Sequence, residues 1–503
     1  MRRLCRIFFS RGALTVVCLA VQLAALWAAA RFYGGAWLNA VMTAGAFALA
    51  IGIAAGRNEP GYKTAWCLLV LAVPVLGIVC YVLLGRSRAD RSLRAMHSAA
   101  QNYLGSVLPK NDAVFERLAM EAPEAAAQSE ALRRLCGASV WFGGQTHWFG
   151  SGEACFQAML ADLRGAKKSI WLEYFIIRPG VMWDAILTVL RQKAAEGLDV
   201  RVIYDDFGCI PGLSGNYPKR LREMRIACRV CNPFTPVLSA HLGSRDHRKL
   251  MLVDGAICYT GGINLSDEYI GLRSRFGTWK DGAIRLEGAA VYGCSALFGA
   301  MWTALGGEAP ELSVPERNFA RYCYVEPFWD SPVFPESVGR SAVTAMVSRA
   351  QERVWLMTPY LVPDEALTAT LCLAAASGVD VRLITPGVGD KWYAQSLSRA
   401  HYPRLTEAGV KIYEYSPGFL HTKACCADGC VAVIGTVNLD YRSFYLQFEN
   451  GVWLYGKETV AALEADFEET FPQCRRITPE DCAAVPWYTR ILRAFIRLFA
   501  PLI

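Results

Sequence analysis

The sequence lacks a dense, regularly spaced set of cysteines. Its 503 residues include 18 cysteines, but these are scattered, which excludes a small secreted disulfide scaffold and favours a reducing compartment. Cys228 and Cys231 form one CxxC pair, and Cys425, Cys426 and Cys430 form a second group. A zinc site would require the two groups to meet in space. Because a lone CxxC is a weak signal and buried free thiols are common, we expect no metal site.

The chain also has little net charge. Its formal charge of +7 suits contact with anionic lipid headgroups or other phosphate-bearing partners, but it does not by itself choose between lipid and nucleic acid. Hydrophobic residues make up 53% of the chain, more than the ~45–50% usual in soluble domains. The excess lies near the N-terminus, which points to a membrane segment.

Three uncharged apolar runs open the chain, at residues 13–30, 36–56 and 64–85. Each is close to the ~20 residues that cross a bilayer core. The first follows a basic stretch as a signal peptide would, but it is long and two further runs come after it, so a retained anchor is expected. Pro74 lies within the third run, where a membrane helix tolerates it as a kink. Residues 1–95 are therefore predicted to be an anchor with two or three transmembrane helices.

Arginines flank these runs on both sides, and the two flanks conflict under the positive-inside rule. An odd number of spans cannot put both flanks in the cytoplasm, so either one run is re-entrant or interfacial, or one flank is translocated. We favour a cytoplasmic second flank, which predicts a multi-pass protein of the cell membrane with its remaining domains in the cytoplasm. The arginines are Arg2, Arg3, Arg6 and Arg11 before the runs and Arg86, Arg88, Arg91 and Arg94 after them.

The rest of the chain repeats itself at a very long period. An Ala-rich, charged connector is expected at residues 96–135, followed by two similar halves at 136–315 and 316–475. Each half contains a strand, helix, strand pattern with short apolar strands, which predicts an α/β lobe with helices on both faces of its sheet. The expected strands are residues 169–175 and 198–204 in the first half and 354–360 and 379–385 in the second.

Both halves carry the same polar motif, offset by 174 residues. One His-x-Lys-x-x-x-x-Asp motif would be weak evidence in a long chain, but a duplicated copy with a matching Gly-x-x-Asn tail is strong. The first copy comprises His247, Lys249, Asp254, Gly261 and Asn264, and the second comprises His421, Lys423, Asp428, Gly435 and Asn438.

The motif predicts one phosphate site shared by the two halves. Residues i and i+2 of a strand face the same side, so each histidine and its lysine should point into one cavity. The lysines, together with the amides of Asn264 and Asn438, can neutralise and orient the oxygens of a phosphate. One imidazole can attack phosphorus while the other protonates the leaving alkoxide, so neither a metal nor another cofactor is required.

These residues resemble the two HKD motifs of the phospholipase D superfamily, and the segments 204–208, 358–360 and 435–443 are similar to the bacterial cardiolipin synthase family. The resemblance implies two pseudo-symmetric phospholipase D-like lobes, each a mixed sheet flanked by helices. It also implies transfer of a phosphatidyl group from one phosphatidylglycerol to another through a phosphohistidine, with release of glycerol. The expected nucleophile is His247.

The resemblance further implies that the motif aspartates, Asp254 and Asp428, are mainly structural. It implies a carboxylate that orients each histidine, which we assign to Glu449 for His421 and to Asp281 for His247.

The third apolar run departs from many relatives, which show two spans. The expected partners are phosphatidylglycerol and anionic membrane lipids. The sequence does not indicate the oligomeric state.

Other functions remain open at this point. A phospholipase D or phosphodiesterase that passes the phosphohistidine to water, yielding phosphatidic acid, would have the same residues. A nuclease would as well, but it needs no membrane spans, so no nucleic acid is expected as a partner. A lipid-binding scaffold with a dead site should have lost a histidine or lysine, and both pairs are intact.

The C-terminal stretch 476–503 is predicted to form an amphipathic helix. Arg490, Arg493 and Arg497 fall on one stripe of it, and apolar residues occupy the remainder. This pattern fits an interfacial helix on an anionic membrane. The alternative is a helix docked on the core of the protein itself.

Overall fold

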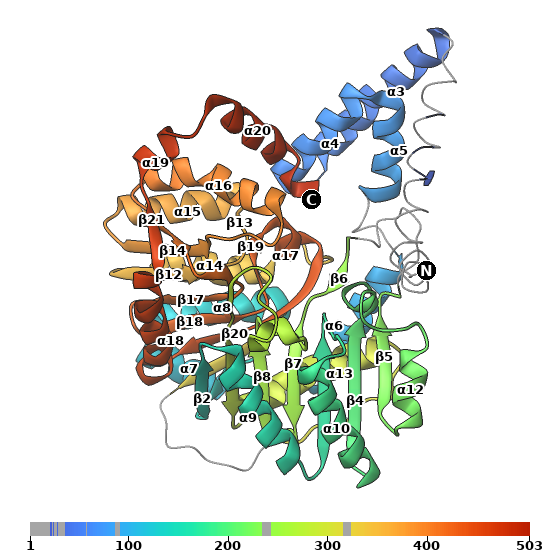
Figure 1. The fold of residues 1–503 in the computed structure, drawn as a ribbon, viewed down its shortest axis with the longest axis vertical. Helices are drawn as coiled ribbons and strands as arrows, with labels where there is room; N and C mark the ends of the chain where they lie inside the picture. Colours follow the sequence, from blue (N-terminus) through green and yellow to red (C-terminus); the bar gives the residue numbers. More distant parts are fainter. Residues whose placement is uncertain are drawn as a thin grey trace.

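A computed structural model describes residues 36–56, 58–85, 91–233, 243–314 and 323–502, and the isolated positions 21, 22, 24 and 28. The first apolar run and its basic flank therefore lie outside the described residues, apart from those isolated positions. Arg86 and Arg88 of the second flank lie outside them as well. The described chain forms a two-lobed body from which a unit of three helices projects at one end (Figure 1).

The first lobe is built on a seven-stranded mixed sheet. Strands β3, β4 and β5 are parallel, and the other neighbours are antiparallel. In sheet order the strands are β2 (Gln145–Phe149), β10 (Ala283–Glu287), β8 (Ile257–Gly261), β7 (Lys249–Val253), β3 (Ser169–Tyr174), β4 (Asp199–Asp205) and β5 (Ala227–Cys231). The helices of this lobe are α9 (Gly152–Gly165), α10 (Val181–Ala195), α11 (Asp206–Cys209), α12 (Tyr217–Glu223) and α13 (Ala290–Ala304), with a 3₁₀ turn η3 (Asp267–Ile270).

The second lobe repeats this order on a larger sheet. Its strands are β1 (Trp141–Phe142), β11 (Tyr324–Asp330), β20 (Gln447–Tyr455), β18 (Val431–Gly435), β17 (Ala424–Ala427), β12 (Arg353–Met357), β14 (Asp380–Pro386), β15 (Lys411–Tyr415) and β21 (Cys474–Ile477). The run from β20 to β15 matches the run from β10 to β5 strand for strand, with β12, β14 and β15 parallel. The duplicated α/β pattern predicted from the sequence is thus present, although β1 comes from the first half and joins the second sheet.

The remaining elements of the second lobe cover this sheet and connect its strands. They are α14 (Val338–Arg349), β13 (Leu361–Val362), α15 (Glu365–Ala376), α16 (Trp392–Glu407), β19 (Leu439–Asp440), α17 (Tyr441–Tyr445), α18 (Lys457–Thr470), η4 (Phe471–Gln473), α19 (Pro479–Ala483), α20 (Trp487–Leu498) and η5 (Ala500–Leu502). The strands are apolar because both faces are covered: all five residues of β7 and of β18 are buried.

The expected connector is part of the body rather than a spacer. It contains α6 (Arg91–Val107), α7 (Asp112–Glu121) and α8 (Pro123–Cys136). Helix α6 packs on α13, and α8 packs on α14 and β11. Leu104 and Leu132 are buried in the same core cluster as the second sheet. The helical periodicity of this segment is therefore that of a helix covering a sheet.

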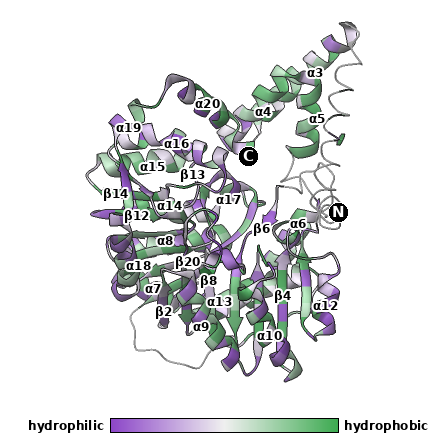
Figure 2. Ribbon diagram, in the orientation of Figure 1, coloured by the Kyte–Doolittle hydropathy of each residue, from purple (hydrophilic) through white to green (hydrophobic). Residues whose placement is uncertain are grey.

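The three projecting helices are α3 (Ala36–Ala55), α4 (Pro60–Ala72) and α5 (Pro74–Leu84). They pack on one another around Ala46, Ile53, Trp66 and Val70 and are mostly hydrophobic (Figure 2). Pro74 does more than kink the third apolar run: α4 ends before it and α5 begins at it, because proline removes a backbone donor. Within the described part of the chain, no helix is both long enough and apolar enough to cross a membrane.

Candidate active site

The two His-x-Lys segments lie at equivalent positions, in breaks between two strands. His247 follows the short strand β6 (Arg245–Asp246) and precedes β7, whose first residue is Lys249. His421 and Lys423 lie between β16 (Gly418–Leu420) and β17. The expectation that each motif lies within a single strand is therefore wrong. The side chains of both pairs are buried.

Short inter-lobe ladders hold these segments in place. Strand β6 runs parallel to the start of β20 in the other lobe, and β16 runs parallel to β9 (Thr278–Lys280) in the first lobe. The amide of His247 donates to the carbonyl of Phe448 at 2.9 Å, and that of His421 donates to the carbonyl of Lys280 at 2.7 Å. Each motif is thus anchored by backbone hydrogen bonds to the opposite lobe.

The residues that follow those two carbonyls are the histidine-orienting carboxylates. Nδ1 of His247 lies 3.0 Å from both carboxylate oxygens of Glu449, and Nδ1 of His421 lies 2.7 Å from Oδ2 of Asp281. The pairing inferred from the sequence, Glu449 with His421 and Asp281 with His247, is therefore wrong. The carboxylates cross between the lobes because β20 and β9 reach across to the opposite motif.

The two lysines complete the cluster. Lys249 is 1% exposed and Lys423 is 4% exposed. Each Nζ donates to the carbonyl of its own motif histidine, and Nζ of Lys423 also lies 2.8 Å from Nδ1 of His421. Burial lowers the pKa of Lys249 to about 7 and that of Lys423 to about 8. An arriving anion would restore their full positive charge, which is the behaviour expected of a phosphate site.

The electrostatics differ between the two histidines. Burial, then the charges of Lys249 and Lys423, hold the pKa of His247 well below its usual value. Burial and Lys423 also lower the pKa of His421, to about 4, but Asp281 opposes them. Although burial raises it, the pKa of Asp281 is lowered overall by His421 and Lys423, whereas burial raises the pKa of Glu449 to about 8. His421 therefore has an ionised partner and takes up a proton more readily than His247.

One position in the repeat differs beside the two carboxylates. Thr436 donates its hydroxyl to Glu449 and accepts from the amide of Asn450 at 3.0 Å. Its counterpart in the first lobe is Gly262, where a Cβ would lie only 2.0 Å from Oδ1 of Asp281. Sequence reasoning missed these supporting roles. The available signal was the change from Gly to Thr at position 436 within an otherwise matching run.

The motif aspartates lie away from the histidines and act on the backbone. Oδ1 of Asp254 accepts from the amides of Lys168 and Ser169, and Asp428 accepts from those of Glu352 and Arg353. Both aspartates have positive φ, 55° and 51°. They join the turn after the motif strand to the start of the neighbouring strand.

The asparagines differ from each other. The side-chain amide of Asn264 donates to the hydroxyl of Tyr269 at 2.7 Å, and its oxygen accepts from Ile176 at 3.0 Å. That amide is therefore already engaged. Asn438 is 5% exposed, and among the described residues its Oδ1 has no partner.

Aromatic rings surround the two imidazoles, a feature that no spacing rule predicts. Phe175 meets the His247 ring at 5.1 Å between centroids, and Tyr269, Trp279 and Phe419 lie within 5.8 Å of the His421 ring. These rings leave the two histidines only 7% and 8% exposed. No group of three or more His, Cys, Asp or Glu in the described part of the chain is arranged to hold a metal ion.

Comparisons with known proteins identify relatives of this chain. The family profile described as "Cardiolipin synthase, PLD-like domain" matches residues 159–274 and 343–471, and the profile "Phospholipase_D-nuclease N-terminal" matches residues 44–86. A protein of Streptococcus mutans described only as uncharacterized is 36% identical, covering 87% of this chain and 96% of its own. A protein of Geobacillus kaustophilus named cardiolipin synthase is 33% identical, covering 92% of this chain and 93% of its own.

A solved structure shares the fold. The crystal structure of a phosphatidylserine synthase from Haemophilus influenzae superposes with a TM-score of 0.58, covering 76% of this chain and 100% of that one. The two sequences are only 14% identical, so this likeness bears on the fold alone.

Proposed function

Because the chain belongs to the cardiolipin synthase family of phospholipase D-like proteins, we propose that it transfers a phosphatidyl group from one phosphatidylglycerol to another and releases glycerol. The observation that carries the proposal is the buried cluster of two histidines and two lysines, in which each imidazole has a carboxylate on Nδ1. A carboxylate there fixes the tautomer and leaves Nε2 free for chemistry.

In the first half-reaction we assign the nucleophile to His247. Its neutral Nε2 attacks phosphorus, and the bond from phosphorus to the glycerol oxygen breaks as the phosphorus–nitrogen bond forms. His421, paired with the ionised Asp281, donates its proton to the departing glycerol oxygen. Lys249 and Lys423 balance the charge on the phosphoryl oxygens as it grows in the transition state. These roles keep the predicted nucleophile but give the acid a different carboxylate.

In the second half-reaction the roles reverse. His421, now neutral, accepts a proton from a hydroxyl of the second phosphatidylglycerol. The resulting oxygen nucleophile attacks phosphorus, the phosphorus–nitrogen bond breaks, and His247 is regenerated. Water in place of this hydroxyl would yield phosphatidic acid. The names of the relatives favour the lipid acceptor.

We also infer that the protein acts at the cell membrane, attached by its N-terminal region and α20, with the lobes in the cytoplasm. The apolar runs and the matched N-terminal profile support this inference. So does α20, which docks on α16 yet leaves Trp487, Ile491 and Phe495 about 60% exposed or more. A helix that turns its large apolar side chains outward is suited to a lipid surface.

The test is mass spectrometry of lipids after incubation of the purified full chain with phosphatidylglycerol. Cardiolipin and glycerol are expected as products, and His247→Ala and His421→Ala should each abolish turnover, because attack and leaving-group protonation belong to one cycle. Phosphatidic acid as the sole product would refute the transferase. About half the activity in each single variant would refute a shared site and indicate two independent ones.

A further inference from the structure

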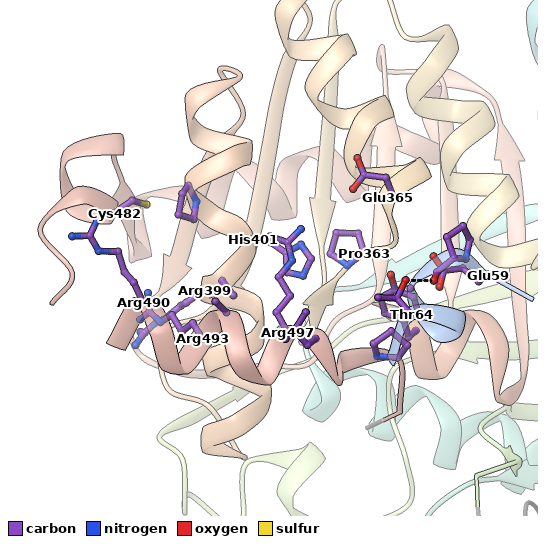
Figure 3. Close-up of a pocket in the computed structure, with 18 residues that line it drawn as sticks. Glu59, Thr64, Pro363, Glu365, Arg399, His401, Cys482, Arg490, Arg493 and Arg497 are labelled. Atoms are coloured by element: carbon purple, nitrogen blue, oxygen red, sulfur yellow. Dashed lines mark hydrogen bonds between the residues drawn. The ribbon is translucent and has the colours of Figure 1, made fainter. Parts of the chain in front are cut away.

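A cavity of about 570 Å³ lies between α4, α16 and α20, outside the histidine and lysine cluster. Segments far apart in the sequence line it: most of its residues come from the start of α4, the middle of α16 and the length of α20, and single residues come from α15, α17, α19 and η5 (Figure 3). None of the four motif side chains or their two carboxylates is among its lining residues. The cavity is therefore separate from the candidate active site.

Arginines dominate one wall of this cavity. Arg490, Arg493 and Arg497 project from the face of α20 that meets α16. The ion pairs formed by the described residues include none to these three side chains, and Nε of Arg493 is buried without a hydrogen-bond partner there. Arg399 of α16 also lines the cavity, but Glu414 binds it at 2.7 and 3.0 Å. Three guanidinium groups thus remain available to an anion.

A buried histidine lies beside them. His401 is 4% exposed and lines the cavity, and neither of its ring nitrogens has a partner among the described residues. Burial, then Arg497 and Arg404, lower its pKa to about 3, so the ring is neutral and offers one N–H donor. An unpaired buried donor costs free energy unless a ligand satisfies it.

The acidic residues of the cavity offset only part of this positive charge. Glu365 is held by Arg404 at 2.6 and 2.7 Å, and Glu59 accepts from the amide of Tyr62 at the start of α4. Arg404 therefore neutralises Glu365, and Glu59 leaves one negative charge against the three guanidinium groups. Guanidinium groups in a concave site bind phosphate oxygens in pairs, which makes a phosphate the anion of best fit.

The surroundings of the cavity indicate which phosphate it is. The opposite face of α20 exposes Trp487, Ile491 and Phe495, and the apolar helices α3 and α4 lie at the same end of the molecule (Figure 1). The C-terminal turn η5 contacts α4, and both contribute residues to the cavity lining. A ligand with both a phosphate and acyl chains would match both features.

We propose that this cavity binds the phosphate of an anionic phospholipid, as a second lipid site separate from the reaction centre. The lipid phosphate is held by Arg490, Arg493, Arg497 and His401, and its acyl chains follow the exposed face of α20. Bound there, it ties the C-terminal helix to the N-terminal helices and to the second lobe. This inference rests on the proposed membrane location but not on the proposed reaction.

The test counts lipids on the full chain in a neutral detergent by native mass spectrometry. Phosphatidylglycerol, phosphatidylcholine and inorganic phosphate are the three probes. The wild type should retain one more phosphatidylglycerol than Arg493→Gln or His401→Phe, each of which should bind that lipid roughly tenfold more weakly after loss of a charge-assisted or buried donor. Arg476→Gln, an exposed arginine of β21 outside the cavity, is the matched control and should keep the wild-type count.

The outcomes separate the two lipid sites. All variants keep His247 and its partners, so lipids at the reaction centre contribute equally to every count, and thermal unfolding checks that each variant is folded. Equal phosphatidylglycerol counts in the wild type, Arg493→Gln and His401→Phe would overturn the proposal. So would equal retention of phosphatidylcholine, or a site that binds inorganic phosphate but no lipid. Failure to form cardiolipin would refute the reaction and leave these counts unaffected.

Discussion

The crossed carboxylates give the sharpest prediction about the reaction centre. Asp281→Asn should disturb His421, and Glu449→Gln should disturb His247, although each carboxylate lies in the lobe of the other histidine. An amide in place of Asp281 can direct its N–H₂ group at Nδ1, which would force the ring proton onto Nε2. His421 would then hold the wrong tautomer for its role as base in the second half-reaction.

The expected magnitude follows from the burial of the pair. His421 is 8% exposed, Asp281 is fully buried, and the contact is 2.7 Å. Loss of a buried hydrogen bond to a charged group costs about 1.5–3 kcal/mol, which corresponds to a rate loss of about 10- to 100-fold. A wrong tautomer adds to this, and in serine proteases the equivalent change costs about 10⁴-fold. We therefore expect kcat to fall by about 10²- to 10⁴-fold in Asp281→Asn.

Nitrogen-15 labelling of the six histidines and NMR of the ring nitrogens would test the pairing directly. The resonances of His421 should change in Asp281→Asn while those of His247 stay in place, and Glu449→Gln should give the reverse. The two variants thus serve as controls for each other. Same-lobe pairing predicts the opposite pattern, and that pattern would refute the crossed arrangement.

Three further predictions concern pH, stability and the covalent intermediate. The kcat/KM of the free enzyme should fall as pH rises through about 7 to 8, because Lys249 and Lys423 lose the charge that binds phosphate; a profile flat to pH 10 would contradict their lowered pKa values. Asp254→Asn should lower the free energy of unfolding by about 1–2 kcal/mol in denaturant titrations and leave kcat per folded molecule unchanged, because its carboxylate binds only backbone amides. With labelled substrate, His421→Ala should slowly accumulate phosphohistidine and His247→Ala should accumulate none; label on residue 421 would reverse the assigned roles.

The lobes and the motif could be predicted from sequence because their signals are local and repeated. The strands at 169–174 and 353–357 are short apolar runs in equivalent positions, and the structure has them as β3 and β12. The motif residues share one offset of 174 residues, which marks them as counterparts. Asp281 and Glu449 do not share that offset, so no periodicity could reveal which histidine each one serves. Their partners depend on β9 and β20 crossing between lobes, which is a tertiary contact.

Other features were missed because packing overrides the local pattern. The segment 96–135 has the composition of an exposed connector, yet its alanine-rich faces cover α13, α14 and β11. The third apolar run is long enough for one span, yet the chain breaks at Pro74 and Gly77 packs against the backbone of Leu69 and Val70. In both cases, local composition allowed several structures and the neighbouring elements selected one.

The crossed pairing also explains how a duplicated fold can give two different histidines. If each lobe supplied its own carboxylate, either lobe could assemble a histidine and its orienting partner alone. With the carboxylates exchanged, neither imidazole is oriented until both lobes are packed together, so the cluster forms as a unit. The exchange also places the longer Glu449, supported by Thr436, against His247 and the shorter Asp281, packed on Gly262, against His421. Those unequal partners give the imidazoles unequal proton affinities, which a nucleophile and an acid in one reaction require.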